Sequence, residues 1–279
     1  MRRTISLILM FSFACASIFI LSCKKSENAS ETKEITIVGS TTVLPVMQKA
    51  VEIYAQNNPD MKITLSGGGS GVGITSLLDG SCNIAMSSRP IKDEEKKQAE
   101  EKGLKLKEVE IGKDGITIVV HASNTIPGIT KEQLKDVYTG KIKNWKEVGG
   151  PDLEIVVVSR DTSSGTFEEF YNKILNKEKM VDSALMQASN AAVRSAVAGA
   201  EGAIGYLGLG FVDSSVKAIK LDGIESTEET VHSLKYPLSR SLYLYIGEDA
   251  AKAILDFVDF ILSPEGQKLV KEEGYLPLK

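Results

Sequence analysis

The sequence predicts an α/β protein, in which strands of a central sheet alternate with helices. Short runs of β-branched residues alternate with amphipathic helical patterns along most of the chain. Three times, a turn rich in Ser, Thr and Gly joins an expected strand to the helix that follows. With 42% hydrophobic and 25% charged residues, the composition is that of a folded globular chain, so a packed core around the sheet is expected.

The N-terminus has the features of a lipoprotein export signal. Two arginines precede an apolar run over 5–21, and a serine and then Cys23 follow it. We expect residues 1–22 to be the signal peptide and Cys23 to carry the lipid. The alternative is an uncleaved transmembrane helix, but a run of about 17 residues is at the lower limit for spanning a bilayer. The polar residues 23–32 are expected to form a flexible tether.

Two turns rich in Ser, Thr and Gly follow the first two expected strands. The strands are expected over 35–38 and 62–65, the turns over 39–42 and 66–73, and helices over 43–54 and 74–78. The N–H groups of a helix's first turn lack partners within the helix, so these turns favour anions. The glycines do not form a nucleotide-binding loop, because no Lys-Ser or Lys-Thr follows them and no G-x-G-x-x-G register fits.

The middle of the chain continues the alternation. A charged helix is expected over 93–102 and ends at Gly103, and a capping box at Thr130 and Gln133 opens a helix that ends at Gly140. Between these helices, two strands are expected over 104–111 and 116–120.

The third turn, over 159–166, contains the strongest single indication of a binding site. It follows an expected strand at 153–158 and precedes a helical pattern at 167–175. Arg160 in this turn can present a planar fork of donors to a tetrahedral oxyanion. An ordinary capped helix beside a surface arginine would look similar. The repetition in three turns favours an anion site, because such turns gather at the carboxyl ends of the strands in an open α/β sheet.

The remaining elements complete the pattern, and the overall charge limits the partners. Helices are expected over 189–198, 254–261 and 265–270, and strands over 202–206 and 242–246. The net charge is −4, which does not suit nucleic acid or a polybasic membrane surface. An acidic chain also repels an anion at long range, so the site must act through close, directed hydrogen bonds. After the expected signal peptide the chain has four arginines: Arg89, Arg160, Arg194 and Arg240.

Six motifs occur in a fixed order from about residue 35 to the end of the chain. They are Gly39-Ser-Thr-Thr with Pro45, Ser66-Gly-Gly-Gly-Ser-Gly, Ser87-Ser88-Arg89-Pro90, Arg160 with Ser164-Gly165-Thr166, Ala203-Ile-Gly-Tyr206 and Tyr236-Pro-Leu-Ser-Arg240. One motif alone would be weak, but the ordered set is specific. Together the motifs resemble the PstS-like, phosphate-binding substrate-binding proteins of ABC phosphate importers.

The resemblance implies a fold and a division into lobes. It implies the two-lobed, type II periplasmic-binding-protein fold, in which two α/β domains are joined by two crossing hinge strands with the ligand cleft between them. The crossings are then expected near 116–120 and 238–243. Lobe one would comprise 33–117 plus 241–279, and lobe two would comprise 118–240.

The resemblance also implies a set of phosphate ligands. The expected contacts are made by Thr41, Thr42, Ser70, Ser88, Arg160, Ser164, Gly165 and Thr166. Arg89 is expected to add a second charge to the site, with pairing to an acidic neighbour as the alternative. One departure is that well-studied members carry, at the position of Ser88, an Asp that accepts a proton from the ligand. The basis of selection against sulfate is therefore open.

The expected function is capture of inorganic phosphate and its delivery to an ABC permease, with permease and ATPase subunits as separate chains. The protein is expected to be exported and monomeric, and to face the periplasm or cell exterior. It would be bound to the cell membrane through its lipid alone, without nucleic acid, metal or cofactor. The alternatives are a receptor for another tetrahedral oxyanion (sulfate, molybdate or tungstate) and a phosphate-sensing or adhesive lipoprotein without a transport role.

An enzyme is not expected from this sequence. It has no G-x-S-x-G motif, and neither His121 nor His232 stands in an evident triad context. No cluster of His, Cys and carboxylate residues has the spacing of metal ligands.

Overall fold

A computed structural model of the protein describes residues 34–278. The expected signal peptide (1–22), the lipidated Cys23 and the tether (23–32) lie outside the described residues and stay predictions. The described residues lie within one compact unit. Within 34–278, no helix is both long enough and apolar enough to cross a membrane.

One mixed sheet runs through the described residues. Its strands are β1 (Glu34–Gly39), β2 (Lys62–Ser66), β3 (Ile84–Ser87), β4 (Leu106–His121), β5 (Gly128–Ile129), β6 (Val156–Arg160), β7 (Leu185–Gln187), β8 (Ala203–Gly208), β9 (Val216–Leu221) and β10 (Ser239–Gly247). The order is β2-β1-β3-β10-β4-β8-β6-β7, and β9 pairs with both β4 and β5. The strands that lead into the three predicted turns, β1, β2 and β6, each have only parallel neighbours in this order.

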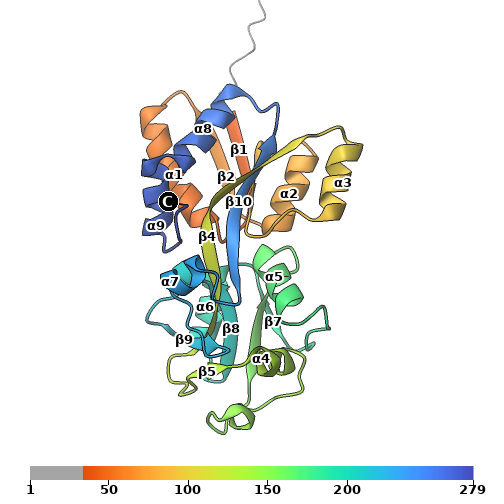
Figure 1. Ribbon diagram of the computed structural model, residues 1–279, viewed down its shortest axis with the longest axis vertical. Coiled ribbons are helices and arrows are strands. Elements are labelled where there is room, and N and C mark those ends of the chain that lie inside the picture. Colours follow the sequence, from red (N-terminus) through yellow and green to blue (C-terminus); the bar gives the residue numbers. More distant parts are fainter. Residues whose placement is uncertain (1–33, 279) are drawn as a thin grey trace, which may run out of the picture. The chain divides into compact units, whose positions relative to one another are not determined.

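Helices cover this sheet, which confirms the predicted α/β class. They are α1 (Leu44–Asn57), α2 (Ser70–Leu78), α3 (Asp93–Glu101), α4 (Lys131–Tyr138), α5 (Gly165–Lys173), α6 (Asn190–Ala198), α7 (Glu228–His232), α8 (Lys252–Leu262) and α9 (Pro264–Glu272), with 3₁₀ turns η1 (Trp145–Val148) and η2 (Leu209–Phe211). In Figure 1, α1 to α3, α8 and α9 surround β1 and β2, whereas α4 to α7 surround β8 and its neighbours. The strands β4 and β10 run between these two groups.

The long strand β4 corrects one prediction. Separate strands were expected over 104–111 and 116–120, but β4 continues through the residues between them. The sequence Gly112-Lys-Asp-Gly115 is typical of a turn, yet its backbone pairs with β10, where Asp114 lies opposite Arg240. Lys113 also exchanges backbone hydrogen bonds with Leu276. These long-range partners override the local turn preference.

Four hydrophobic clusters lie among the described residues, and the two largest follow the sheet. The first joins β1, α1, β10 and α8 through residues such as Ile37, Met47 and Phe257. The second joins β4, α4, α5 and β8 through residues that include Phe170 and Tyr206. The rings of Phe170 and Tyr206 stack with centroids 3.9 Å apart, so α5 is fixed against β8. This contact holds the start of α5 at the end of β6.

Two boundaries near the predicted turns also differ from expectation. The helix α2 begins at Ser70 rather than at residue 74. Gly73 lies within this helix and packs closely on β1. A Cβ at this position would come within 2.7 Å of the Gly39 Cα, so only glycine allows this approach. The strand β6 spans Val156–Arg160 rather than 153–158, since Leu153 and Ile155 bond instead to the segment around Trp145. The sequence did not predict β5, β7, β9 or α7.

Candidate functional site

The start of α5 forms one wall of the candidate site. Ser164 is the N-cap, and its hydroxyl accepts a hydrogen bond from the Phe167 N–H at 3.3 Å. Gly165 and Thr166 follow in the first turn and are buried. A Cβ on Gly165 would lie 2.4 Å from the Ser70 Oγ and 2.8 Å from the Ser88 Oγ. Glycine is therefore required for the close approach of α5 to the residues opposite.

The start of α2 and the end of β3 form the opposite wall. Ser70 and Ser88 are buried, and the Ser88 N–H donates to the Ser70 Oγ at 3.1 Å. The two hydroxyl oxygens are 3.4 Å apart. The Gly71 N–H donates to the Ser163 carbonyl at 3.0 Å, so the first turn of α2 contacts the turn before α5 directly.

The turn before α1 completes the cluster. The Thr42 Oγ1 lies 3.2 Å from the Thr166 Oγ1. The Arg160 Nη2 donates to the Thr41 Oγ1 at 3.1 Å. All three predicted turns therefore meet at one place, although the residues that these two contacts join are 124 and 119 positions apart.

Arg160, the last residue of β6, is 1% exposed. Its Nε donates to the Gln187 carbonyl, and its Nη2 donates to the Ala188 carbonyl, both at 3.1 Å. Its Nη1 is buried and has no hydrogen-bond partner among the described residues. Burial lowers the pKa of this guanidinium, and the nearby Asp161, 3.6 Å from Nη2, opposes that shift. Arginine stays charged in proteins, so Arg160 is a buried cation whose Nη1 has no hydrogen-bond partner among the described residues.

Tyr206 fixes the backbone at the start of this turn. Its Oη lies 2.8 Å from the Ser159 Oγ and accepts a hydrogen bond from the Arg160 N–H at 3.3 Å. Burial raises the pKa of Tyr206 to about 12, so the phenol keeps its proton at neutral pH. The hydroxyl can then accept and donate at once, which holds the third turn on β8.

The structure brings together eight of the nine predicted ligand residues. They are Thr41, Thr42, Ser70, Ser88, Arg160, Ser164, Gly165 and Thr166. Their hydroxyls, the N–H groups at two helix starts and one guanidinium suit an oxyanion. That these residues contact a ligand stays a prediction.

Arg89 is placed differently. Its Nη1 and Nη2 donate to the two carboxylate oxygens of Glu95 at 2.8 and 2.7 Å. Its Nε lies 2.5 Å from the Glu168 Oε2. This arrangement matches the alternative, in which Arg89 pairs with acidic neighbours, and no hydrogen bond in residues 34–278 joins its side chain to the eight clustered residues.

Three buried polar residues at the cluster were not predicted as site residues. The Arg240 Nη1 donates to the Thr166 Oγ1 at 3.0 Å, and Asp114 pairs with Arg240 from β4. The Asn190 Nδ2 donates to the Thr42 Oγ1 at 2.9 Å. Arg240 could have been found, because it ends the sixth motif and arginines are scarce. Nothing in the sequence pointed to Asp114 or Asn190.

The clustered residues do not resemble a metal site or a catalytic site that uses histidine. Within residues 34–278, no group of three or more His, Cys, Asp or Glu residues could hold a metal ion. The His121 Nδ1 lies 2.7 Å from the Ser123 Oγ at the exposed end of β4, and His232 ends α7. Neither histidine hydrogen-bonds to a clustered residue in the described part of the chain.

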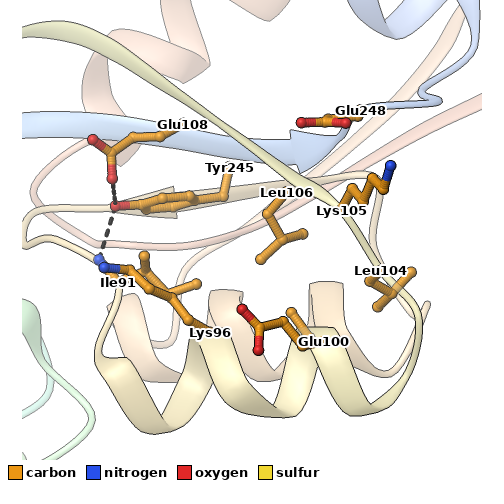
Figure 2. Close-up of a pocket in the computed structure, with 10 residues that line it drawn as sticks. Ile91, Lys96, Glu100, Leu104, Lys105, Leu106, Glu108, Tyr245 and Glu248 are labelled. Carbon is orange, nitrogen blue, oxygen red and sulfur yellow. Dashed lines mark hydrogen bonds between the residues drawn. The ribbon is translucent and has the colours of Figure 1, made fainter.

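A separate pocket of ≈ 360 Å³ lies between α3 and the strands β4 and β10 (Figure 2). The Tyr245 Oη accepts from the Ile91 N–H at 2.9 Å and lies 2.6 Å from the Glu108 Oε2. The lining of this pocket includes three glutamates, Glu100, Glu108 and Glu248, and two lysines, Lys96 and Lys105, and none of the eight clustered residues. This mixed lining, with more carboxylates than ammonium groups, does not favour an anion.

Comparisons with known proteins agree with the geometry. A family model described as a PBP superfamily domain matches residues 25–265. The "Phosphate-binding protein PstS" of Staphylococcus aureus (strain USA300) is 37% identical over 252 residues, which cover 85% of this chain and 76% of that protein.

Two solved structures are also similar. A putative phosphate ABC transporter substrate-binding protein from Clostridium perfringens, solved with bound phosphate, is 40% identical with a TM-score of 0.83, covering 88% of this chain and 100% of that one. An ABC-type phosphate transport receptor from Vibrio cholerae is 35% identical with a TM-score of 0.74, covering 87% and 99%.

Proposed function

Because the chain belongs to the PBP superfamily, we propose that it binds inorganic phosphate and delivers it to an ABC-type import permease. The observation that carries this proposal is the Arg160 guanidinium. It is buried, and its Nη1 has no hydrogen-bond partner among the described residues. An unsatisfied buried donor is costly, and an oxyanion would satisfy both the donor and the charge.

The surrounding groups suit phosphate in number and kind. A dianion leaves water at high cost unless each of its oxygens is hydrogen-bonded. The cluster offers the hydroxyls of Thr41, Thr42, Ser70, Ser88, Ser164 and Thr166 and the N–H groups at the start of α5. Arg160 adds the charged fork, and we assign all eight clustered residues as ligands.

The two-lobe division is also a proposal, with lobe one at 33–117 plus 241–279 and lobe two at 118–240. Two hydrophobic clusters support it, since β1 and α8 share one and α5 and β8 share the other. The Thr42–Thr166 and Thr41–Arg160 contacts join residues of the two lobes. We infer that the lobes are in contact around the site and that opening of the hinge strands breaks these contacts.

The cellular location and the partner chains are proposed from the same family resemblance. We propose an exported monomer anchored by lipid on Cys23, facing the periplasm or cell exterior, with permease and ATPase subunits as separate chains. Its role is binding rather than catalysis, as the names of its relatives indicate. Replacement of Cys23 by Ala should abolish incorporation of labelled fatty acid, and continued labelling would contradict the anchor.

The test of the function is thermal unfolding of residues 24–279 with added anions. A ligand that binds only the native state stabilises it by about 2.7 kcal/mol at a hundredfold excess over its Kd. Phosphate should raise the Tm by this mechanism, and sulfate and molybdate should not at equal concentration. Equal protection by sulfate would point to a general oxyanion receptor, and hydrolysis of p-nitrophenyl phosphate would point to an enzyme.

A further inference from the structure

Arg240 on β10 contacts three of the proposed ligand residues without being one of them. Its Nη1 donates to the Thr166 Oγ1 at 3.0 Å and to the Ser88 carbonyl at 3.2 Å. Its Nη2 donates to the Thr42 Oγ1 at 3.4 Å. Thr42 and Ser88 belong to lobe one and Thr166 to lobe two, so this guanidinium joins the two walls of the site.

The carboxylate of Asp114 anchors Arg240. The two residues lie opposite each other on the antiparallel strands β4 and β10. The Asp114 Oδ2 accepts from the Arg240 Nε at 3.0 Å and from Nη2 at 2.6 Å, while Oδ1 accepts from the Leu209 N–H at 2.9 Å. Asp114 is fully buried. The pair therefore holds Nη1, the nitrogen that faces Thr166, in one position.

These contacts decide which way two hydroxyl protons point. A nitrogen of arginine or of a side-chain amide can only donate, so the Thr166 Oγ1 accepts from Arg240. The Thr42 Oγ1 likewise accepts from the Asn190 Nδ2. Each hydroxyl has one proton of its own, which is then left to donate. The Thr42 and Thr166 oxygens are 3.2 Å apart, so one can donate to the other and the second proton is free for an anion.

We propose that Arg240 is a positioning and specificity-determining residue of the anion site, which orients the hydroxyls of Thr42 and Thr166 as donors and favours the more highly charged form of the bound oxyanion. The inference rests on the proposed phosphate-binding function and adds to it a preference between the monoanion and the dianion of phosphate.

The groups around Arg240 leave a positive charge on the ligand side. Asp114 on β4 contacts its Nε and Nη2 but not Nη1, which faces Thr166. Arg160 on β6 is the second guanidinium at the cluster, and its nearby carboxylate, Asp161, is 3.6 Å from Nη2. The phenols of Tyr236 and Tyr275 also lie near this buried pair. Burial raises the pKa of both phenols, so they stay neutral near pH 7. Two guanidiniums close to one anion favour a dianion over a monoanion.

The test is the pH profile of phosphate affinity in the Arg240→Gln variant. Wild-type affinity should rise as pH passes through the second ionisation of phosphate, because the dianion fraction grows. Glutamine keeps a donor amide but carries no charge, so the rise should be flattened. At high pH the affinity should fall about tenfold or more, as expected for loss of charge-assisted hydrogen bonds.

A double variant separates this role from a structural one. Arg240→Gln alone leaves Asp114 buried without its cation, which destabilises the fold. Asp114→Asn with Arg240→Gln makes the pair neutral and should recover much of the Tm, while the flattened pH profile remains. Arg194→Gln is the matched control, since Arg194 pairs with Asp213 at 2.9 Å on the surface and should change neither quantity.

The outcomes distinguish the two proposals. Phosphate binding by the wild type with an unchanged pH profile in both the single and the double variant would overturn the role of Arg240 alone. A wild type that binds no phosphate would overturn the proposed function, and this inference with it. The Asn190→Ala variant should weaken binding without altering the pH profile, because Asn190 donates to Thr42 but has no charge.

Discussion

Two arginines lie in neighbouring regions of the molecule with nearly equal burial, 1% exposed for Arg160 and 2% for Arg89, and they have opposite surroundings. The guanidinium of Arg89 faces the carboxylates of Glu95 and Glu168. The guanidinium of Arg160 bonds to two carbonyls and a hydroxyl, and its Nη1 has no partner among the described residues.

The difference shows that burial does not identify an anion-binding arginine. Two carboxylates balance the charge of Arg89, and its two terminal nitrogens already donate to Glu95. The charge of Arg160 is less balanced, because the nearby Asp161 is 3.6 Å away and also accepts from the Ser163 N–H, and its Nη1 has no hydrogen-bond partner among the described residues. The set of partners therefore separates a binding arginine from a structural one, and the predictions below test this difference.

The largest effect on stability is expected from Glu168→Ala. The Glu168 carboxylate pairs with Arg89 and, at 2.7 Å, with Lys92, so its loss leaves a buried guanidinium partly uncompensated. Removal of one partner of a buried pair costs about 3–5 kcal/mol. Denaturation by urea would measure the change in the free energy of unfolding. A loss below about 1 kcal/mol, the size of a surface pair, would show that the buried pair of Arg89 and Glu168 does not stabilise the fold.

The sequence pointed to Arg160, left the role of Arg89 open and did not place Arg240 at the cluster. The start of α5 follows from local rules: a helical period, an N-cap serine and a preceding strand all lie within about 20 residues of Arg160. One Arg89 partner, Glu95, is only 6 positions away, but the other, Glu168, lies on α5, and the Arg240 partner Asp114 is 126 positions away. Such pairings depend on strand register and packing, which a local pattern does not contain.

The fold itself shows the same limit. The order of strands and helices and most helix ends follow from periodicity and caps, as at Thr130 and Ser164. The continuity of β4 does not, because Gly112 to Gly115 are held extended by β10 and Leu276 rather than by their own preference. The proposed lobe boundaries come from the family resemblance of the ordered motifs, since local patterns do not define them.

A smaller effect on affinity is expected from Thr166→Val. The substitution keeps the shape of the side chain and the backbone N–H at the start of α5, and removes one hydroxyl. A neutral hydrogen bond contributes about 0.5–1.5 kcal/mol, so phosphate affinity should fall by up to about tenfold. Calorimetric titration would measure the Kd. A loss as large as that of Arg160→Ala would indicate that Thr166 supports the fold of the site.

No effect is expected from Arg194→Ala. Arg194 is on α6 and bonds to the Phe211 carbonyl and to Asp213, away from the clustered residues. Its phosphate Kd should equal that of the wild type in the same titration. A higher Kd would mean that the affinity depends on the general charge of the protein. The different partners of Arg89 and Arg160 would then not explain which arginine binds phosphate.

The most direct measurement is the Kd for phosphate of Arg160→Ala beside that of Arg89→Ala. A charge-assisted hydrogen bond contributes about 1.5–3 kcal/mol, and Arg160 can make two of them to an oxyanion, so affinity should fall by about two orders of magnitude or more. Arg160→Lys should recover little, because an ammonium lacks the planar fork. Arg89→Ala should lower stability but change the Kd far less. If the phosphate Kd of Arg160→Ala were within about threefold of the wild-type Kd, a shift under 1 kcal/mol, the account would be contradicted.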